Sequence, residues 1–132
     1  GKGFTLTELM IVVVILAVAA TLVIPRFSAQ SERGAAAEAV AHLSAIRQAE
    51  ASHALENNGN ITTDINDLDI DNPNTPANRK FDYTFDVLVP PPAFTAIATR
   101  VSGGTFAGQT ITLTSDGTWG GNHPFRPANP GD

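Results

Sequence analysis

Hydrophobic residues follow three successive patterns along this chain, and the first is an almost unbroken apolar run over residues 4–24. An α-helix of that length covers the ~30 Å hydrocarbon core of a bilayer. A chain in lipid must satisfy its backbone hydrogen bonds internally, so we expect a helix here in spite of the many β-branched residues. Two residues interrupt the pattern, because Glu8 puts a carboxylate inside the run and Pro25 closes it.

After Pro25 the pattern becomes that of an amphipathic helix. Residues 28–56 are rich in Ala, Glu, Gln, Leu and Arg, which are good helix formers. A helix can pass through a proline if it loses one hydrogen bond and bends, so we expect it to continue to about Glu56, with Gly34 as a second weak point. Asn57-Asn58-Gly59 is a helix stop signal. The predicted buried face holds Ala36, Ala39, Val40, Leu43, Ile46 and Ala49, whereas Glu38, Arg47, Gln48 and Glu50 are expected largely elsewhere.

From residue 81 the apolar positions alternate with polar ones, which predicts half-buried β-strands. The first candidate strand covers residues 81–89, the second 94–101, and the third lies within 109–119. Asp116-Gly117 predicts a tight turn, after which Thr118-Trp119 begins a short returning strand. We therefore expect three or four antiparallel strands with one face on the amphipathic helix. The predicted inward residues are Phe81, Tyr83, Phe85, Val87 and Val89 of the first strand and Ile111 and Leu113 of the third.

The segment between helix and strands, residues 57–80, mixes Asp, Asn, Thr and Pro and is predicted to be a connecting loop. Asp64 is placed to cap a short helix that holds Ile65, Leu68 and Ile70. The alternate spacing of Asp67, Asp69 and Asp71 raises a calcium site, but the glycine and glutamate of an EF-hand loop are absent, so a solvated acidic loop is the competing interpretation. Asn60 begins an Asn-Ile-Thr pattern that accepts N-glycans.

Composition narrows the function classes. A net charge of -5 and a pI near 5.0 argue against a nucleic-acid-binding surface, which needs a basic patch. With no cysteine, the chain has no disulfide and no thiol nucleophile. His42 and His53 lie ~16 Å apart along the predicted helix, too far to share a metal, and His123 is the remaining histidine. No nucleophile elbow or phosphate loop is present, so we expect a protein that is not an enzyme and needs no cofactor.

Three interpretations account for the apolar run. A cleavable secretory signal would use Lys2 as its basic end and Ala17-Val18-Ala19 as its cleavage site, but it leaves Glu8 and the continuation to Ile24 unexplained. An ordinary membrane anchor explains the length and treats Glu8 as a cost, about 2.5–3.5 kcal/mol near the bilayer centre. The third interpretation gives the carboxylate a partner.

The third interpretation matches a known motif. GFTLTE followed by an apolar helix resembles the N-terminal processing motif of type IV pilins and of the pseudopilins of type II secretion systems. The resemblance implies that a prepilin peptidase cuts between Gly3 and Phe4 on the cytoplasmic side and that the new amine of Phe4 is methylated. Glu8 then matches the glutamate of the motif, and Pro25 matches the proline that loosens the helix in many members.

Phe4 and Glu8 are the predicted assembly residues. When helices stack into a filament, the carboxylate of one subunit can meet the Phe4 amine of a neighbour, which offsets the desolvation of both ions. A misaligned helix would leave a charge unpaired among apolar side chains, so the pair would select one axial stagger. If residues 1–3 persist in the mature chain, Phe4 has no free amine and this pairing fails.

The expected fold is α+β and pilin-like, with a long N-terminal helix packed on a small antiparallel sheet. Gly34 and Pro25 are the expected joints of that helix. The expected segments are a leader remnant (1–3), a hydrophobic transmembrane and polymerisation helix (4–27), an amphipathic helix half (28–56), a connecting loop (57–80), a sheet (81–119) and an irregular tail (120–132) that forms a surface loop or an inter-subunit contact.

The resemblance also implies a function and a location. It implies a bacterial structural subunit, a major pilin, that waits in the inner membrane and then polymerises into an extracellular filament. Its partners would be copies of itself, the prepilin peptidase and a membrane assembly platform, and no nucleic acid.

Other subunit types share these features. A minor pilin, a pseudopilin and a monomeric membrane-anchored binding module are the alternatives, and a solitary anchor would gain nothing from Glu8. Many pilins close their C-terminal region with a disulfide, which this chain cannot form, and many pseudopilins bind calcium there, where this chain offers mainly Asp116 and Asp132.

Overall fold

The computed structural model describes residues 3–88, 90, 92–102 and 104–132, without the side chains of residues 20–28. The chain divides into two compact units, Gly1–Gly34 and Ala35–Asp132. Each unit is described below by itself. The remaining residues, among them Lys2 of the predicted leader and Val89 of the first predicted strand, lie outside the described part.

A single long helix, α1, runs over Leu6–Glu56. Its backbone is helical at Pro25 and at Gly34, so the predicted continuation past the proline is confirmed. The helix ends where the stop signal predicts. Asn58 and Gly59 have φ angles of 59° and 85°, and the Gly59 N–H donates to the Ala54 carbonyl at 2.7 Å. Such a left-handed turn satisfies the last carbonyls of a helix.

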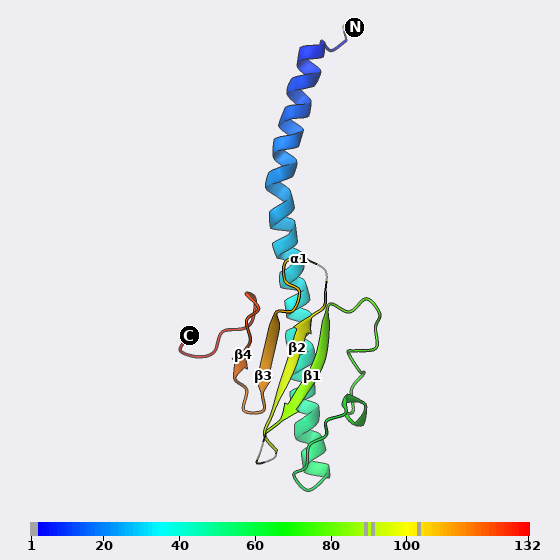
Figure 1. Ribbon diagram of the computed structural model, residues 1–132, viewed down its shortest axis with the longest axis vertical. Coiled ribbons are helices and arrows are strands. Elements are labelled where there is room, and N and C mark those ends of the chain that lie inside the picture. Colours follow the sequence, from blue (N-terminus) through cyan, green and yellow to red (C-terminus); the bar gives the residue numbers. More distant parts are fainter. Residues whose placement is uncertain (1–2, 89, 91, 103) are drawn as a thin grey trace. The chain divides into compact units, whose positions relative to one another are not determined.

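The sheet consists of four antiparallel strands in the order β1-β2-β3-β4. The strands are β1 (Phe81–Val87), β2 (Phe94–Arg100), β3 (Thr110–Thr114) and β4 (Trp119–Gly120), and Figure 1 shows them as a meander. The β3–β4 turn is at Gly117, whose φ of 97° favours glycine. The predicted α+β fold class and the strand positions are therefore confirmed.

The core of the second unit lies between the later part of α1 and one face of the sheet (Figure 1). The helix contributes small and branched side chains at spacings of three and four, which lets it approach the strands closely. The sheet contributes alternate residues of β1, β2 and β3. The buried helix residues are Ala36, Ala39, Leu43 and Ile46, and the buried strand residues are Phe81, Tyr83, Phe94, Ala96, Ala98, Ile111 and Leu113.

Two predicted positions are wrong. Glu50 was expected away from the buried face, yet it is 0% exposed, because the spacing Leu43, Ile46, Glu50 continues the same helical stripe. Val87 was expected inward, yet it is 38% exposed, because burial of the inward side chains decreases along β1. Phe85, between these extremes, is half-buried.

The connecting loop contains the predicted capped helix, but as a three-residue 3-10 helix, Ile65–Asp67, that ends before Leu68 and Ile70. The Asp64 carboxylate accepts a hydrogen bond from the Asn66 N–H at 2.9 Å. Ile65 and Leu68 are buried in the core cluster, and Ile70 packs against it. The loop is thus held to the second unit by its few apolar residues.

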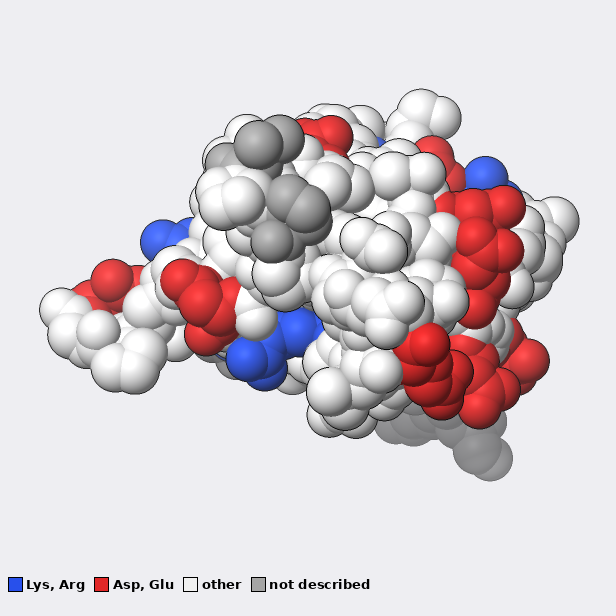
Figure 2. All heavy atoms as spheres, turned by 90° about the horizontal axis from the view of Figure 1, so that it is seen from below, with Lys and Arg blue, Asp and Glu red and all other residues white. Residues whose placement is uncertain are grey.

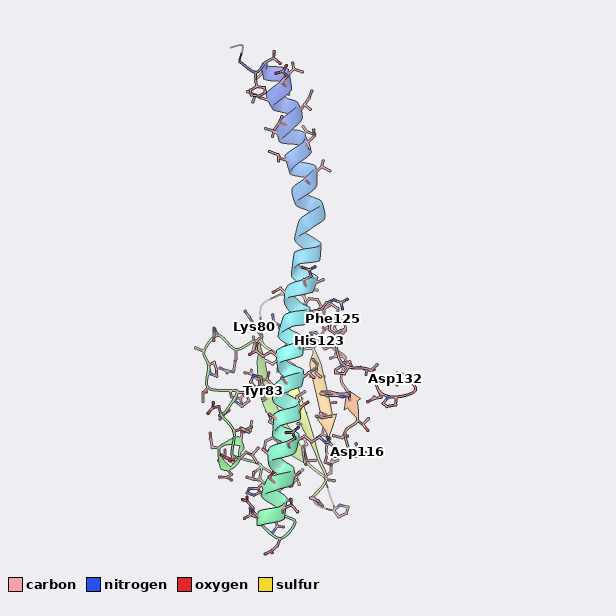
Figure 3. All side chains as sticks on the ribbon, turned by 180° about the vertical axis from the view of Figure 1, so that it is seen from behind. Lys80, Tyr83, Asp116, His123, Phe125 and Asp132 are labelled. Atoms are coloured by element: carbon pink, nitrogen blue, oxygen red, sulfur yellow. The ribbon has the colours of Figure 1, made fainter. Side chains whose placement is uncertain are left out.

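The C-terminal tail is attached to the core through His123. This side chain is 1% exposed, and its ring lies 5.6 Å from the Phe106 ring and 5.7 Å from the Phe81 ring between centroids. Its Nδ1 accepts a hydrogen bond from the Phe125 N–H at 3.1 Å. Figure 3 shows His123 and Phe125 together at one end of the sheet. The tail is therefore anchored in the unit by an aromatic cluster.

Both outer strands of the sheet are paired with an asparagine side chain. Asn74 donates from Nδ2 to the Tyr83 carbonyl of β1 at 2.8 Å and accepts from the Tyr83 N–H at 2.7 Å. Asn129 makes the same pair of bonds to Trp119 of β4, both at 2.8 Å. Each amide occupies backbone groups that an added strand would use, so it covers part of an exposed sheet edge.

Replacing Asn74 by alanine is expected to lower the free energy of unfolding by about 1–2 kcal/mol, since two hydrogen bonds to the half-buried Tyr83 backbone are lost. Denaturant unfolding of the full chain in nonionic detergent, followed through the fluorescence of Trp119, measures the change. Asn78→Ala in the same loop is the matched control, because Asn78 is exposed. Equal stability of the two variants would contradict the role given to Asn74.

Candidate functional site

The N-terminal residues form the first part of the candidate site. Helix α1 begins at Leu6, so the predicted cleavage site between Gly3 and Phe4 precedes the helix. Phe4 is 79% exposed, and a Cβ atom placed on Gly3 would meet nothing within 4 Å. Proteases act on exposed, non-helical backbone. The predicted scissile bond therefore lies in a segment that a peptidase can bind.

Thr5 and Glu8 form a reciprocal cap at the start of α1. The Glu8 N–H donates to Thr5 Oγ1 at 3.2 Å, and the Thr5 N–H donates to Glu8 Oε2 at 3.2 Å. This arrangement is a capping box, which satisfies two of the unpaired N–H groups of a helix start. It was not predicted from the sequence, although Thr-x-x-Glu before an apolar run is its signature. Glu8 therefore has a structural role within one chain as well as its predicted role between chains.

The apolar side chains that follow Glu8 are exposed on all sides of α1. A helix that is apolar all round is stable only when lipid or other chains cover it. Each of the large apolar side chains from Leu9 to Val18 has about half or more of its surface exposed. They are Leu9 (50%), Met10 (62%), Ile11 (55%), Val12 (48%), Val13 (64%), Val14 (61%), Ile15 (61%), Leu16 (63%) and Val18 (56%).

The predicted membrane-spanning segment, residues 4–27, extends into residues 20–28, whose side chains lie outside the described part. Within the residues that the structure does describe, no helix has an apolar stretch of sufficient length to span a membrane.

The two predicted joints, Pro25 and Gly34, lie within the helical part of the chain, and Gly34 is the last residue of the first compact unit. The backbone at Gly34 does not need glycine, because its φ lies outside the left-handed region and a Cβ atom there would meet nothing within 4 Å. Glycine in a helix interior lowers helix stability by ~1 kcal/mol relative to alanine. A glycine that is not required for space is consistent with a joint.

Gly34→Ala is expected to stabilise α1 locally by about 0.5–1 kcal/mol. Amide hydrogen exchange around residue 34 should slow by roughly threefold to fivefold in the full chain. Ala37→Gly, at an exposed position of the same helix, is the matched control and should speed exchange. Unchanged exchange in Gly34→Ala would show that glycine does not loosen this part of α1.

The aspartates of the connecting loop, Asp64, Asp67, Asp69 and Asp71, are exposed in the structure. Among the described residues, no group of three or more carboxylate or histidine side chains has the geometry to hold a metal ion. Asp67 instead accepts a hydrogen bond from the Thr62 hydroxyl at 2.7 Å. Asp69 and Asp71 are exposed, as is Asn60 of the glycosylation pattern. Calcium binding by these aspartates and a glycan on Asn60 remain predictions.

The candidate residues at the C-terminus are also separate. Asp116 is hydrogen-bonded within the β3–β4 turn to Thr114 and Thr118, and the Thr114 hydroxyl lowers the pKa of the Asp116 carboxyl most strongly. Asp132 accepts from the Asn129 N–H at 2.8 Å and lies 3.8 Å from the Arg126 guanidinium. Each of the two carboxylates thus forms hydrogen bonds within its own segment of the chain.

Comparison with known proteins bears on the N-terminal segment first. A family model described as the prokaryotic N-terminal methylation motif matches residues 2–24. The chain is also similar to the type II secretion system core protein G of Aeromonas hydrophila, with 39% identity over 63 residues, which is 48% of this chain and 44% of that protein. It is similar to two fimbrial proteins of Pseudomonas aeruginosa, with 44% identity over 55 residues, which is 42% of this chain and 36% of theirs.

These similarities cover less than half the length of the curated relatives. No solved structure matches the chain at a comparable level.

Proposed function

We propose that this chain is a structural subunit, a major pilin, that polymerises into an extracellular filament. The match of residues 2–24 to the prokaryotic N-terminal methylation motif supports this proposal, as does the similarity to fimbrial proteins and to a type II secretion core protein G. Polymerisation buries the apolar side chains of the N-terminal half of α1 between copies. Before assembly the same segment is held in the bacterial inner membrane. The proposed role is structural rather than catalytic.

The observation that carries this proposal is the exposure of large apolar side chains all round the start of α1. A surface helix with one partner needs one apolar stripe, whereas a helix with neighbours on every side needs apolar residues everywhere. Lipid supplies that environment in the membrane, and a bundle of identical helices supplies it in a filament. Transfer of the helix from the membrane to the filament costs little free energy, because the lipid and the helix bundle are both apolar.

Processing prepares the chain for assembly in this proposal. Prepilin peptidase cuts between Gly3 and Phe4, and the Phe4 amine is methylated. The amine remains positively charged, and the Glu8 carboxylate of a neighbouring copy lies in its reach in the bundle. The pair fixes the axial stagger of the helices, since any other stagger leaves a charge unpaired.

A second candidate function is that of a pseudopilin, and the similarity to core protein G of a type II secretion system favours it. A pseudopilin would share the N-terminal segment and differ in the length and number of its filaments. The second unit favours neither the pilin nor the pseudopilin. Its C-terminal tail is held by the buried His123 and by the hydrogen bonds of Asn129, and not by the disulfide of many pilins. A minor pilin would be a scarce subunit of a filament made by another chain.

Electron microscopy of material sheared from expressing cells tests the proposed function. Long filaments labelled along their whole length by an antibody to the second unit are expected for a major pilin. Labelling at filament ends alone would indicate a minor pilin. Short filaments that appear only on overexpression, with loss of protein secretion on deletion, would indicate a pseudopilin. A chain that stays monomeric in the membrane would overturn all three.

A further inference from the structure

Glu50 is a buried carboxylate on α1 with an unused oxygen. The residue is 0% exposed, and its Oε2 accepts a hydrogen bond from the Thr62 N–H at 3.2 Å. Its Oε1 has no hydrogen-bond partner among the described residues. Arg47, one turn earlier, lines the same hollow as Glu50 and Ser115, and its Nε donates to the Ser115 carbonyl at 3.0 Å. A buried acceptor without a donor is costly and rare, so Oε1 requires an explanation.

Glu50 lines an open hollow of about 460 Å³ in the second unit. The hollow lies between the last turns of α1 and the strand ends at Phe94 and Ser115. Apolar side chains form much of its wall, and one of them, Leu55, is 89% exposed. An apolar wall that leads to a carboxylate suits a side chain with an aliphatic stem and an ammonium at its tip.

Lys80 has an aliphatic stem and an ammonium tip. It lies just before the start of β1, whereas the hollow lies near the end of that strand. It is the only lysine after Lys2, and it is exposed. Its ammonium has no ion-pair partner among the described residues, whereas the adjacent Arg79 pairs with Asp82 at 2.6 Å. Among the described residues, Lys80 is therefore a cation at this end of the sheet that is available to another chain.

The strand register places Lys80 and the hollow at opposite ends of the second unit. Phe81 pairs with Arg100 at one end of β1, and Val87 pairs with Phe94, a residue of the hollow, at the other. The length of the strand separates them by about 23 Å, so Lys80 cannot reach Glu50 of its own chain. In Figure 3, Lys80 lies toward one end of the sheet and Asp116, next to Ser115, toward the other.

The charges of the two ends are complementary. Figure 2 looks onto the end where α1 stops and shows more acidic than basic surface there. Arg79, Lys80 and Arg100 lie at the start of β1 and the end of β2, which is the opposite end. Complementary ends favour a head-to-tail contact over a contact between two like ends.

We propose that the Lys80 ammonium of one copy enters the hollow of the next copy and donates a hydrogen bond to Glu50 Oε1. The proposal rests on the proposed function, since it names a contact between second units of a polymer. The two surfaces differ, so the contact is heterologous and propagates into a filament instead of closing a dimer. Glu50 is covered in the single chain, so entry of the ammonium requires the side chains that cover it to move.

Cysteine crosslinking tests the contact, because the chain has no cysteine of its own. Chains with Leu55→Cys and chains with Asn78→Cys, which keeps Lys80, are expressed together and treated as filaments with a short bis-maleimide. Roughly tenfold more crosslinked dimer is expected than for Leu55→Cys with Thr84→Cys, an exposed position in the middle of β1, since the reaction follows effective concentration. Equal dimer yields in filaments of normal appearance would overturn the proposal.

A double-mutant cycle tests the chemistry. Glu50→Gln and Lys80→Gln should each increase, by roughly tenfold, the fraction of subunits that heat releases from sheared filaments, and the double variant should release no more than either single one. Arg126→Gln, a charge change at a residue that faces Asp132 of its own chain, is the matched control and should leave release unchanged. Additive effects of Glu50→Gln and Lys80→Gln would overturn the pairing.

Failure of this proposal and failure of the proposed function are distinguishable. If the unsubstituted chain forms no filament of any length, the proposed function fails first. If it forms filaments and both tests are negative, the polymer stands and the contact between Lys80 and Glu50 is wrong.

Discussion

Glu8→Gln is expected to be cleaved and inserted normally but to yield at least roughly tenfold fewer filaments than the unsubstituted chain. Glutamine at this position still accepts a hydrogen bond from the Thr5 N–H, so the capping box and the helix start are preserved. What is lost is the charge that would face the Phe4 amine of a neighbour. A buried ion left without its partner costs about 3–5 kcal/mol, which is enough to prevent stable packing. Immunoblots of sheared filaments against whole-cell protein measure the yield.

Thr5→Ala separates the two roles of Glu8. It removes the hydroxyl that caps the Glu8 N–H, which costs about 1 kcal/mol at a helix start, and it keeps the carboxylate. We expect filament yield to fall far less than in Glu8→Gln. Mass spectrometry of the mature N-terminus is the control, since both variants must begin at Phe4. Poor assembly of Thr5→Ala and normal assembly of Glu8→Gln would mean that the cap, and not the charge, is what assembly requires.

The elements of the fold were predictable because their signals are local. The end of α1 follows from Asn58-Gly59, which enters the left-handed region as the stop signal requires. The strands follow from alternation, and Ile111 and Leu113 are buried as predicted. Glu50 could have been placed too, because the spacing from Leu43 and Ile46 puts it on the buried stripe. The sequence interpretation placed Glu50 away from the buried face because its side chain is charged, although its spacing indicated burial.

The rest of the second unit depends on contacts between residues distant in sequence. Asn74 of the connecting loop and Asn129 of the C-terminal tail form hydrogen bonds to strand backbones. Neither segment has a sequence signal that shows which of its polar side chains will bind a strand. His123 stands in a segment of Gly and Pro without periodicity, and the aromatic rings that surround it come from distant parts of the sequence as well as from Phe125. In the N-terminal segment the capping box has a sequence signature, Thr-x-x-Glu. It was not predicted because the assembly role already explained Glu8.

Glu50 connects the stability of one chain with the strength of the polymer. In the single chain its unpaired Oε1 weakens the folded state, and in the proposed contact the same oxygen receives the Lys80 ammonium. A site that is unfavourable alone and favourable in the assembly penalises monomers and so promotes polymerisation. This arrangement predicts opposite effects of one substitution on the two states.

Glu50→Gln is expected to raise the free energy of unfolding of the unassembled chain by about 1–3 kcal/mol near neutral pH, while it weakens the filament. The amide keeps an acceptor for the Thr62 N–H and removes a buried charge, whose desolvation is the penalty. Glu50→Ala, in contrast, also loses the bond to Thr62 and leaves a cavity, so it should not stabilise. Glu56→Gln, at an exposed position of the same helix, is the matched control and should change little.

The pH dependence of stability identifies the charge as the cause. Burial raises the pKa of the Glu50 carboxyl above its ordinary value, opposed by the Thr62 N–H and by His53 and reinforced by Asp67. In the window between the ordinary and the raised pKa, the folded chain holds a proton that the unfolded chain has released. Stability from this group is therefore complete below the ordinary Glu pKa and falls as pH rises through the raised pKa.

The difference in unfolding free energy between Glu50→Gln and the unsubstituted chain should thus grow with pH across that window and then level off. Asp116 works in the opposite sense, because its pKa is lowered and its contribution is lost only as pH falls, but it is common to both proteins and cancels in the difference. Unfolding curves read from Trp119 at several pH values between about 4 and 7 measure it, since that range brackets the ordinary Glu pKa and neutral pH. A difference that stays constant with pH would mean that the Glu50 carboxyl has the same pKa in the folded and unfolded chains and that packing alone explains any gain.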